Sequence, residues 1–507
     1  MQHNEANFRR PAPERNISSL FRLPSSVVGR WAVFFVLALL ALAVRLPRLG
    51  ERPMHTDESV NAYLIGEILG GENYHYDPRD RHGPVLYLLA EPLARICGAR
   101  TFADLTESEL RLTPVIVGSA TVLLFGAGVE MFGFIPCFIA ALLFVIAPLP
   151  VYYSRYFIHE TVFVAVTLGL MIFGWRALKT NSLLSAAATG LFAALLVGCK
   201  ETFVIHFFAL GLGMAVVWFI PPRGKWPSLK AILVALGVFA VTAIVLFTWF
   251  GKNWSGLADL FRAAPNMAAR AAGEGHQKSF AYYFGLMDPT FLLFLLAAVG
   301  VYSAIRDGLS RGRKAGLLLA IYALAIFLIY SAIPYKTPWL ALNLWLPLSL
   351  FCGMGMARIC SLLKNSPSRW IAALAAGFLL ALIGRQTVSV AFEHPADQKN
   401  PLAYAHTVED VLRLPPRLDQ LAKEQNLSSP LIAVVAADAW PLPWYLRKFK
   451  RVGFWQPGQD PGEADFYLTS PTAAEPLGDK LKDRRPQFFG VRPEVIIILW
   501  SRETPAP

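Results

Sequence analysis

Residues 27–44 read VVGRWAVFFVLALLALAV, and after a short connection residues 54–59 read MHTDES. The first stretch is apolar over a length sufficient for a membrane-crossing helix, which needs roughly 17 to 25 residues. The residues after it, Leu46-Pro47-Arg48, do not form the small-residue cleavage site of a secretory leader. We therefore predict a retained first span, with two adjacent carboxylates, Asp57 and Glu58, close beyond its end.

The composition of the whole chain is that of a polytopic α-helical membrane protein. Of its 507 residues, 55% are hydrophobic and only 16% are charged, well outside the proportions of soluble proteins. Apolar segments of spanning length recur along the chain, and we predict about eleven transmembrane helices. These segments lie near residues 28–46, 111–131, 134–152, 157–177, 183–199, 202–220, 231–250, 287–305, 315–333, 338–360 and 370–391.

The net charge of +12 suggests either a nucleic-acid partner or an orientation in the membrane. Lysine and arginine occupy connections between apolar segments and form no stripe with aromatic residues, so the pattern argues against nucleic acid. Because cytoplasmic loops are enriched in basic residues, we predict that the tail 1–27 is cytoplasmic. An odd number of spans then places the segment after residue 392 outside the cytoplasm.

The first outer loop, 51–110, is predicted to contain two surface helices. The first is Asp57–Leu69, with Thr56 as its N-cap and two glycines as its stop signal. The second is Pro84–Ile96, whose apolar residues suit a position in the membrane interface.

The composition changes again at the C-terminal end. The charged fraction rises, and short apolar runs bounded by turn residues indicate strands. We therefore predict a transmembrane domain at 28–392 and a small extracytoplasmic α/β domain at 393–507. The predicted strands are 431–436, 464–468 and 495–500.

The predicted orientation brings the polar side chains best suited to chemistry to one outer face. Ionisable groups at membrane depth are costly and are candidates for a functional site. A carboxylate can act as a general base or hold a cation, whereas basic groups can bind a phosphate. The candidates are Asp57, Glu58, His82, Arg155, His159, Glu160, Lys200, Glu201, Tyr335, Lys336 and Trp339.

Each group of candidates also has a purely structural explanation. The two acids of the first loop favour a helix start through the helix dipole. Arg155 and Lys200 can pair with carboxylates in a cavity wall, and Tyr335 and Trp339 can belong to an interfacial aromatic belt rather than stack on a sugar.

A metal site has weaker support in the sequence. His55 and Asp57 are candidate ligands of a divalent ion, but no spacing motif accompanies them. We therefore predict no certain cofactor and leave a divalent metal as an open alternative.

Six short motifs follow one another along nearly the whole chain. They are His55 to Glu58, Tyr74 to Pro78 with His82 to Pro84, Arg155 to Glu160, Lys200-Glu201, Lys336 to Leu340 and Trp440 to Arg447. In this order they resemble the GT-C membrane glycosyltransferases, in the branch of protein O-mannosyltransferases and aminoarabinose transferases. A closer similarity is to a bacterial and archaeal family labelled flippase activity-associated protein.

The resemblance implies a transferase in a bacterial or archaeal inner membrane. It would move a sugar, with inversion, from a polyprenyl-phosphate donor to a hydroxyl of a lipid, glycan or protein. It implies Asp57 as the catalytic base with Glu58 beside it and Glu160 as a second acid. Lys200 and Lys336 would contact the lipid phosphate or the cavity.

One residue departs from the family pattern, and one alternative function stays open. His159 stands before Glu160, where the pattern has Asn or Asp, which weakens metal binding through two acidic loops. The alternative is a non-catalytic accessory of lipid-linked glycan export that binds lipid phosphate. Paired halves with broken spans, typical of an autonomous transporter, are not evident in the sequence.

Overall fold

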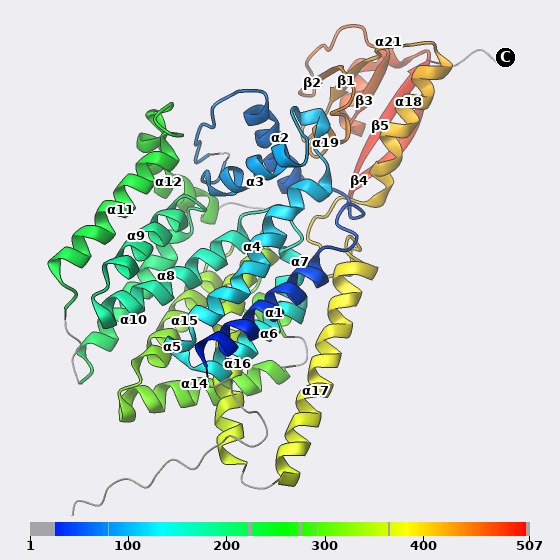
Figure 1. The fold of residues 1–507 in the computed structure, drawn as a ribbon. Helices are drawn as coiled ribbons and strands as arrows, with labels where there is room; N and C mark the ends of the chain where they lie inside the picture. The colour runs from blue at the N-terminus through cyan, green and yellow to red at the C-terminus, as the bar shows by residue number, and fades with distance from the viewer. Residues whose placement is uncertain are drawn as a thin grey trace, which may run out of the picture.

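The computed structural model describes residues 26–79, 81–221, 226–272, 276–288, 291–363 and 366–502. Most of the predicted tail and the last residues of the predicted C-terminal domain lie outside these ranges. The described chain forms a large helical part, coloured blue to yellow in Figure 1, and a small sheet domain at its C-terminal end.

Within the described ranges, eight helices are long and apolar enough to cross a membrane. A spanning segment must satisfy its backbone polar groups internally, which a helix does. Three further apolar helices are shorter, and together these helices correspond to the apolar segments of the sequence. The eight are α1 (Val27–Arg45), α4 (Glu107–Ala127), α8 (Glu160–Thr180), α11 (Leu229–Phe247), α14 (Leu292–Arg311), α15 (Lys314–Ala332), α16 (Ala341–Leu362) and α17 (Ser366–Val388); the shorter ones are α6 (Phe134–Ile146), α9 (Leu183–Val197) and α10 (Phe203–Phe219).

The long helices pack closely through small residues. Helix α16 packs against α14 and α6 in the middle of the helical part. Gly300 on α14 and Gly355 on α16 permit the closest approach, because a Cβ at Gly300 would lie 1.9 Å from the carbonyl oxygen of Phe351. Small residues allow such backbone approach between membrane helices.

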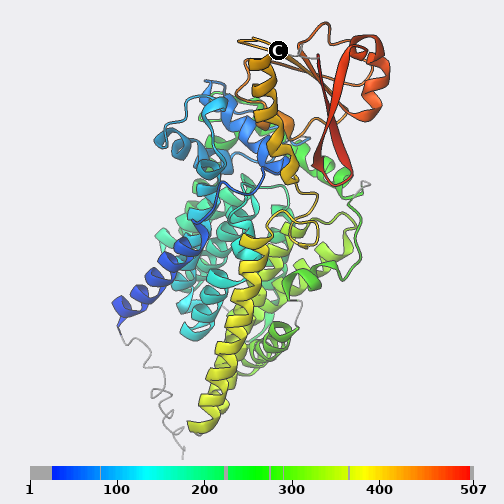
Figure 2. The ribbon, with the colours of Figure 1, turned by 90° about the vertical axis from the view of Figure 1, so that its right-hand side faces the viewer.

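Both ribbon views place the sheet domain, α2 and α3 at the same end of the helical part, which we call the outer end (Figures 1 and 2). The predicted surface helices are present there as α2 (Thr56–Leu69) and α3 (Val85–Ile96). The remaining helices of the helical part are α5 (Val129–Phe132), α7 (Pro148–Tyr153), α12 (Ser255–Ala272) and α13 (Tyr282–Met287).

The N-cap predicted for α2 is wrong by one residue. His55, not Thr56, caps the helix: its Nδ1 accepts the backbone N–H of Asp57 at 3.0 Å. In return, the carboxylate of Glu58 accepts the backbone N–H of His55 at 3.1 Å. Histidine is not among the usual N-cap residues, so the sequence pattern did not indicate it.

The C-terminal domain contains a mixed five-stranded sheet in the order β2-β1-β3-β5-β4. Strand β1 pairs in parallel with β2 and β3, while β5 pairs antiparallel with β3 and β4. The strands are β1 (Leu431–Val435), β2 (Arg451–Trp455), β3 (Phe466–Thr469), β4 (Arg484–Arg492) and β5 (Val495–Arg502), and the helices are α18 (Leu414–Glu424), α19 (Leu442–Tyr445), α20 (Pro471–Ala474) and α21 (Gly478–Leu481).

The sequence predicted the three inner strands β1, β3 and β5 and missed the two edge strands. Edge strands carry charged residues and proline, because one side of their backbone has no partner strand. Strand β4 begins Arg484-Arg485-Pro486, and β2 begins at an exposed arginine, so neither has the apolar run of a buried strand.

Candidate functional site

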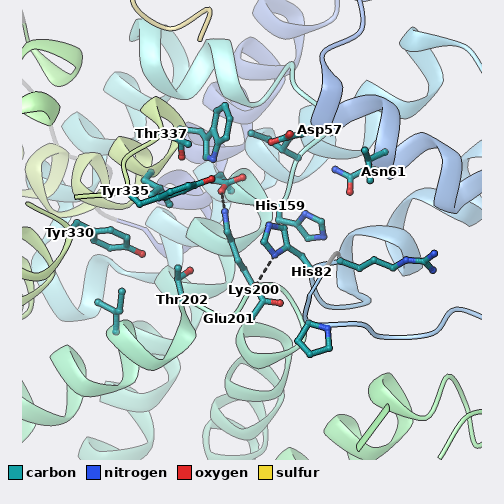
Figure 3. Close-up of a pocket in the computed structure, with 18 of the residues that line it drawn as sticks. Asp57, Asn61, His82, His159, Lys200, Glu201, Thr202, Tyr330, Tyr335 and Thr337 are labelled. Carbon is teal, nitrogen blue, oxygen red and sulfur yellow. Dashed lines mark hydrogen bonds and ion pairs between the residues drawn. The ribbon is translucent and has the colours of Figure 1, made fainter. Parts of the chain in front are cut away.

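A cavity of about 580 Å³ lies at the outer end, between the first outer loop and the ends of α8, α10 and α15. Both polar and apolar side chains line it. The polar ones include Asp57, Asn61, Arg81, His82, His159, Glu160, Lys200, Glu201, Thr202 and Thr337, and the apolar ones Ile158, Ile205, Ile329, Ile333 and Leu340. Figure 3 shows Asp57, from the start of α2, and Lys200, from the connection between α9 and α10, projecting into this space.

Glu58 lies outside the lining of this cavity and is fully buried. Arg111 donates to both carboxylate oxygens, each at 2.8 Å, and Arg52 lies 3.4 Å away. The backbone N–H groups of Phe157 (2.9 Å) and His55 (3.1 Å) also donate to it. These contacts support a structural role for Glu58, while the catalytic role that the resemblance implies stays a prediction.

The same contacts keep Glu58 ionised. Burial alone would raise its pKa, but the charges of Arg111 and Arg52 and the donated hydrogen bonds hold the pKa below its ordinary value. The carboxylate thus joins α2, α4 and the connection before α8 into one unit.

Asp57, the neighbouring residue, lies on the cavity wall. Its side chain is 47% exposed, and within the described chain only the His55 ring, 4.0 Å away, comes within ion-pair distance. Because its carboxylate is not neutralised by an arginine or lysine contact, it can accept a proton from a ligand held in the cavity.

Lys200 and Glu160 form a buried ion pair on the cavity wall. Lys200 follows α9, and Glu160 is the first residue of α8. Burial alone would lower the pKa of Lys200, but the charge and hydrogen bond of Glu160 raise it, so the ammonium remains protonated. An ammonium group has three donors, of which Glu160 occupies one.

Glu201 and His82 form a second pair beside Lys200. The Nδ1 atom of His82 lies 2.7 Å from the Glu201 carboxylate (Figure 3). The hydroxyl of Tyr76 donates to the other carboxylate oxygen at 2.9 Å. The ring of His82 lies edge-on to His159, with centroids 5.0 Å apart. Glu201 is thus engaged within the wall, and it orients the imidazole of His82.

The Glu201 contacts predict a pH effect on stability. Burial alone would raise the pKa of Glu201, but the charge and hydrogen bond of His82 lower it to about 2. An unfolded glutamate takes up its proton near pH 4.5. The folded protein must therefore lose stability relative to the unfolded chain as pH falls from that value towards 2. In melting experiments in detergent, the advantage of wild type over Glu201→Gln should be full at pH 7 and shrink towards pH 3; a constant difference would contradict the assignment.

Two predicted binding residues lie elsewhere. Arg155 is not among the residues that line the cavity, and it donates to the backbone carbonyls of Arg45 (2.5 Å) and Pro47 (2.6 Å). Lys336 is buried and donates to the carbonyls of Ile333 (2.6 Å) and Lys278 (3.2 Å). Their neighbours His159, Tyr335 and Trp339 do line the cavity.

Both ring nitrogens of His55, a candidate metal ligand, have partners within the protein. Its Nδ1 accepts the Asp57 amide, and its Nε2 lies 3.2 Å from the carbonyl of Tyr404. Burial lowers the pKa of its ring against the opposing charges of Asp57 and Glu58. Among the described residues, no three His, Cys, Asp or Glu side chains converge to hold a metal ion.

Some lining residues were not predicted from the sequence, although signals for them exist. Asn61 lies one helical turn after Asp57 and so faces the same side of α2. Thr202 directly follows the Lys200-Glu201 pair, and Tyr330 is a polar residue near the outer end of an apolar helix.

The helical membrane part, the polar cavity under the outer loops and the small sheet domain together define the class: the chain is a multi-pass membrane protein with the GT-C fold. The structure of ArnT from Cupriavidus metallidurans bound to undecaprenyl phosphate is similar over 95% of this chain and 100% of its own, with a TM-score of 0.65 and 16% identity. The apo oligosaccharyltransferase of Archaeoglobus fulgidus matches 91% of this chain and 74% of its own, with a TM-score of 0.55 and 14% identity.

A third similar structure is the mycobacterial arabinofuranosyltransferase AftD, which matches over 95% of this chain and 40% of its own, with a TM-score of 0.51 and 13% identity. No protein-family model matches the sequence, and no curated protein sequence matches it significantly. The GT-C resemblance of the sequence is thus confirmed for the fold, while the narrower family resemblance stays a prediction.

Proposed function

We propose that this protein is a membrane glycosyltransferase that takes a sugar from a polyprenyl-phosphate donor and passes it to a hydroxyl group. One observation carries the proposal. Asp57, a carboxylate without an arginine or lysine partner in the described chain, shares a cavity with the ammonium group of Lys200, and apolar side chains also line this cavity. A base, a cation and an apolar surface are the three features that such a donor and acceptor require.

The proposed reaction is a single displacement at the anomeric carbon. Asp57 accepts the proton of the acceptor hydroxyl as its oxygen attacks that carbon from the face opposite the phosphate. The bond between the carbon and the phosphate oxygen breaks, and the lipid phosphate leaves as an anion near Lys200. Positioning and charge stabilisation account for most of the rate in such a step. The configuration of the sugar is inverted.

The apolar residues of the cavity lining support a lipid-linked donor. Ile205 lies near the start of α10, and Ile329 and Ile333 lie at the outer end of α15, so the cavity borders helices that face a bilayer. Two similar structures contain such lipids, namely ArnT with undecaprenyl phosphate and the Archaeoglobus fulgidus oligosaccharyltransferase AglB with dolichol phosphate. The acceptor is a lipid, glycan or protein hydroxyl.

We place the cavity on the extracytoplasmic side of a bacterial or archaeal inner membrane, with the sheet domain on the same side. The enrichment of basic residues in the opposite connections supports this orientation. The proposed organisation is a transmembrane domain at 28–392 followed by an extracytoplasmic α/β domain at 393–507.

Lys200→Met is expected to weaken the binding of undecaprenyl phosphate by about 10- to 100-fold, since a charge-assisted hydrogen bond contributes roughly 1.5 to 3 kcal/mol. The single variant should also melt earlier, because Glu160 would be buried without its partner. The double variant Lys200→Met/Glu160→Gln should recover the melting temperature but not the binding. Lys336→Met is the matched control: it removes a buried lysine outside the cavity lining and should keep wild-type affinity.

The decisive experiment uses purified protein in nanodiscs with radiolabelled undecaprenyl-phosphate hexoses and membrane extracts as the acceptor source. Transfer of label to a new product, absent with heat-inactivated protein, supports the proposal. Saturable binding of the lipid without any turnover would overturn it in favour of the accessory of glycan export.

A further inference from the structure

The C-terminal part of the chain forms hydrogen bonds with the segment that immediately precedes Asp57. The backbone N–H of Met54 donates to the phenol oxygen of Tyr445 at 2.8 Å, and the hydroxyl of Thr407 donates to the Met54 carbonyl at 2.7 Å. Met54 is fully buried. Both backbone polar groups of this residue are therefore satisfied by side chains more than 350 positions later in the sequence.

The C-terminal part also contacts the next residue, His55. Its Nε2 lies 3.2 Å from the carbonyl of Tyr404, so this nitrogen carries the proton and donates. The other ring nitrogen is then an acceptor, and it caps the amide of Asp57 at 3.0 Å. The ring also packs against His406 and Trp339, with centroids 5.5 and 5.9 Å away. Tyr404 thus selects the tautomer that caps the helix carrying Asp57.

A second set of contacts attaches the C-terminal part to the helical part. Helix α19 lies beside α2 (Figure 1). The indole N–H of Trp444 donates to Glu107 at 2.7 Å, and Arg447 donates to the Leu105 carbonyl at 2.9 and 3.1 Å. These contacts attach α19 to the start of α4, a transmembrane helix of the same cavity-bearing part.

We propose that Tyr404, Thr407 and Tyr445 form a clamp that positions the Asp57 carboxylate, so that the C-terminal domain takes part in the reaction as a positioning element. This inference rests on the proposed function. The three residues contact Met54 or His55 and act through them, so they are positioning residues. A displacement of about 1 Å at a reacting group can cost 100-fold in rate, so even a slight loosening of this segment is measurable.

The test compares Tyr445→Phe and Thr407→Val with Tyr467→Phe. Tyr467 is a matched control because it is buried in the same domain, donates to the Gly462 carbonyl at 2.8 Å and accepts from the Ala464 amide at 3.1 Å. It belongs to a different hydrophobic cluster from Met54. We expect kcat to fall about tenfold or more in each clamp variant, with KM unchanged. The control should lose melting temperature to a similar extent and keep the wild-type kcat.

A second measurement separates the clamp from the reaction. Hydrogen–deuterium exchange of peptides covering residues 50–60 should accelerate in Tyr445→Phe and remain at the wild-type rate in Tyr467→Phe. Unchanged exchange, or a kcat equal to that of the control, would overturn the clamp. If wild-type protein shows no transfer at all, the proposed function fails, whereas the exchange experiment still decides whether the clamp exists.

Discussion

Asp57→Asn is expected to lower the transfer rate by about 100- to 10,000-fold, the contribution of a general base, without unfolding the protein. The asparagine side chain has the same shape but cannot accept the proton of the acceptor hydroxyl. The carboxylate is half-exposed, and the basic group nearest to it in the described chain is the His55 ring, 4.0 Å away, so its removal leaves no buried group unpaired. The change in the free energy of unfolding should stay below about 1 kcal/mol, the scale of a helix-dipole interaction.

Single-turnover transfer from a labelled polyprenyl-phosphate sugar measures this effect, together with the melting temperature of each variant. Glu72→Gln provides the control, since Glu72 is an exposed acid just beyond the end of α2 and outside the cavity lining. Its rate should match the wild type. Full transfer by Asp57→Asn would remove Asp57 from the role of base, even if the protein proved to be a transferase.

Glu58→Gln should have the opposite effect, a large loss of stability. The neutral side chain would leave the guanidinium groups of Arg111 and Arg52 buried without a counter-charge. Breaking a buried ion pair by removing one partner costs about 3 to 5 kcal/mol, a large share of the stability of a typical domain. We therefore expect Glu58→Gln to lose much more stability than Asp57→Asn, although the two residues are adjacent.

Melting in detergent and the yield of monodisperse protein measure this loss. Arg52→Met offers a graded comparison in case Glu58→Gln does not fold. It leaves the Arg111 pair intact and removes the 3.4 Å contact to Glu58, together with the hydrogen bond from Arg52 to the Arg155 carbonyl at 2.7 Å and the stacking of its guanidinium on Tyr156. The expected order of stability is wild type and Asp57→Asn first, then Arg52→Met, then Glu58→Gln. A Glu58→Gln protein as stable as wild type would show that the carboxylate does not hold the outer loop.

The contrast between these two acids illustrates what sequence analysis can and cannot provide. Consecutive residues of an α-helix point about 100° apart, so Asp57 and Glu58 could not both face the cavity. Which one would face the cavity depended on Arg111, a residue 53 positions later on α4. The sequence pattern carries no information about that partner. The family resemblance favoured Asp57 as the base, but nothing in the local residues separated the two carboxylates until the helices packed.

The same reason explains the two basic residues that lie elsewhere. Arg155 and Lys336 stand in motifs next to lining residues, as the sequence predicted for binding groups. Their side chains instead donate to backbone carbonyls at helix ends, which have no partner within the helix. Which side chain reaches these carbonyls is decided only when the helices pack. The clamp at Met54 is equally invisible in the sequence, because its partners are separated by most of the chain.

By itself, the sequence determined the apolar segments and their order, the two helices of the first outer loop and the inner strands of the C-terminal sheet. These features depend on local hydrophobicity and turn chemistry, which are properties of short stretches. The tertiary structure alone decided which polar side chains neutralise each other and which one keeps a free carboxylate in the cavity. That choice depends on distances between groups far apart in the chain, and it sets Asp57 apart from Glu58.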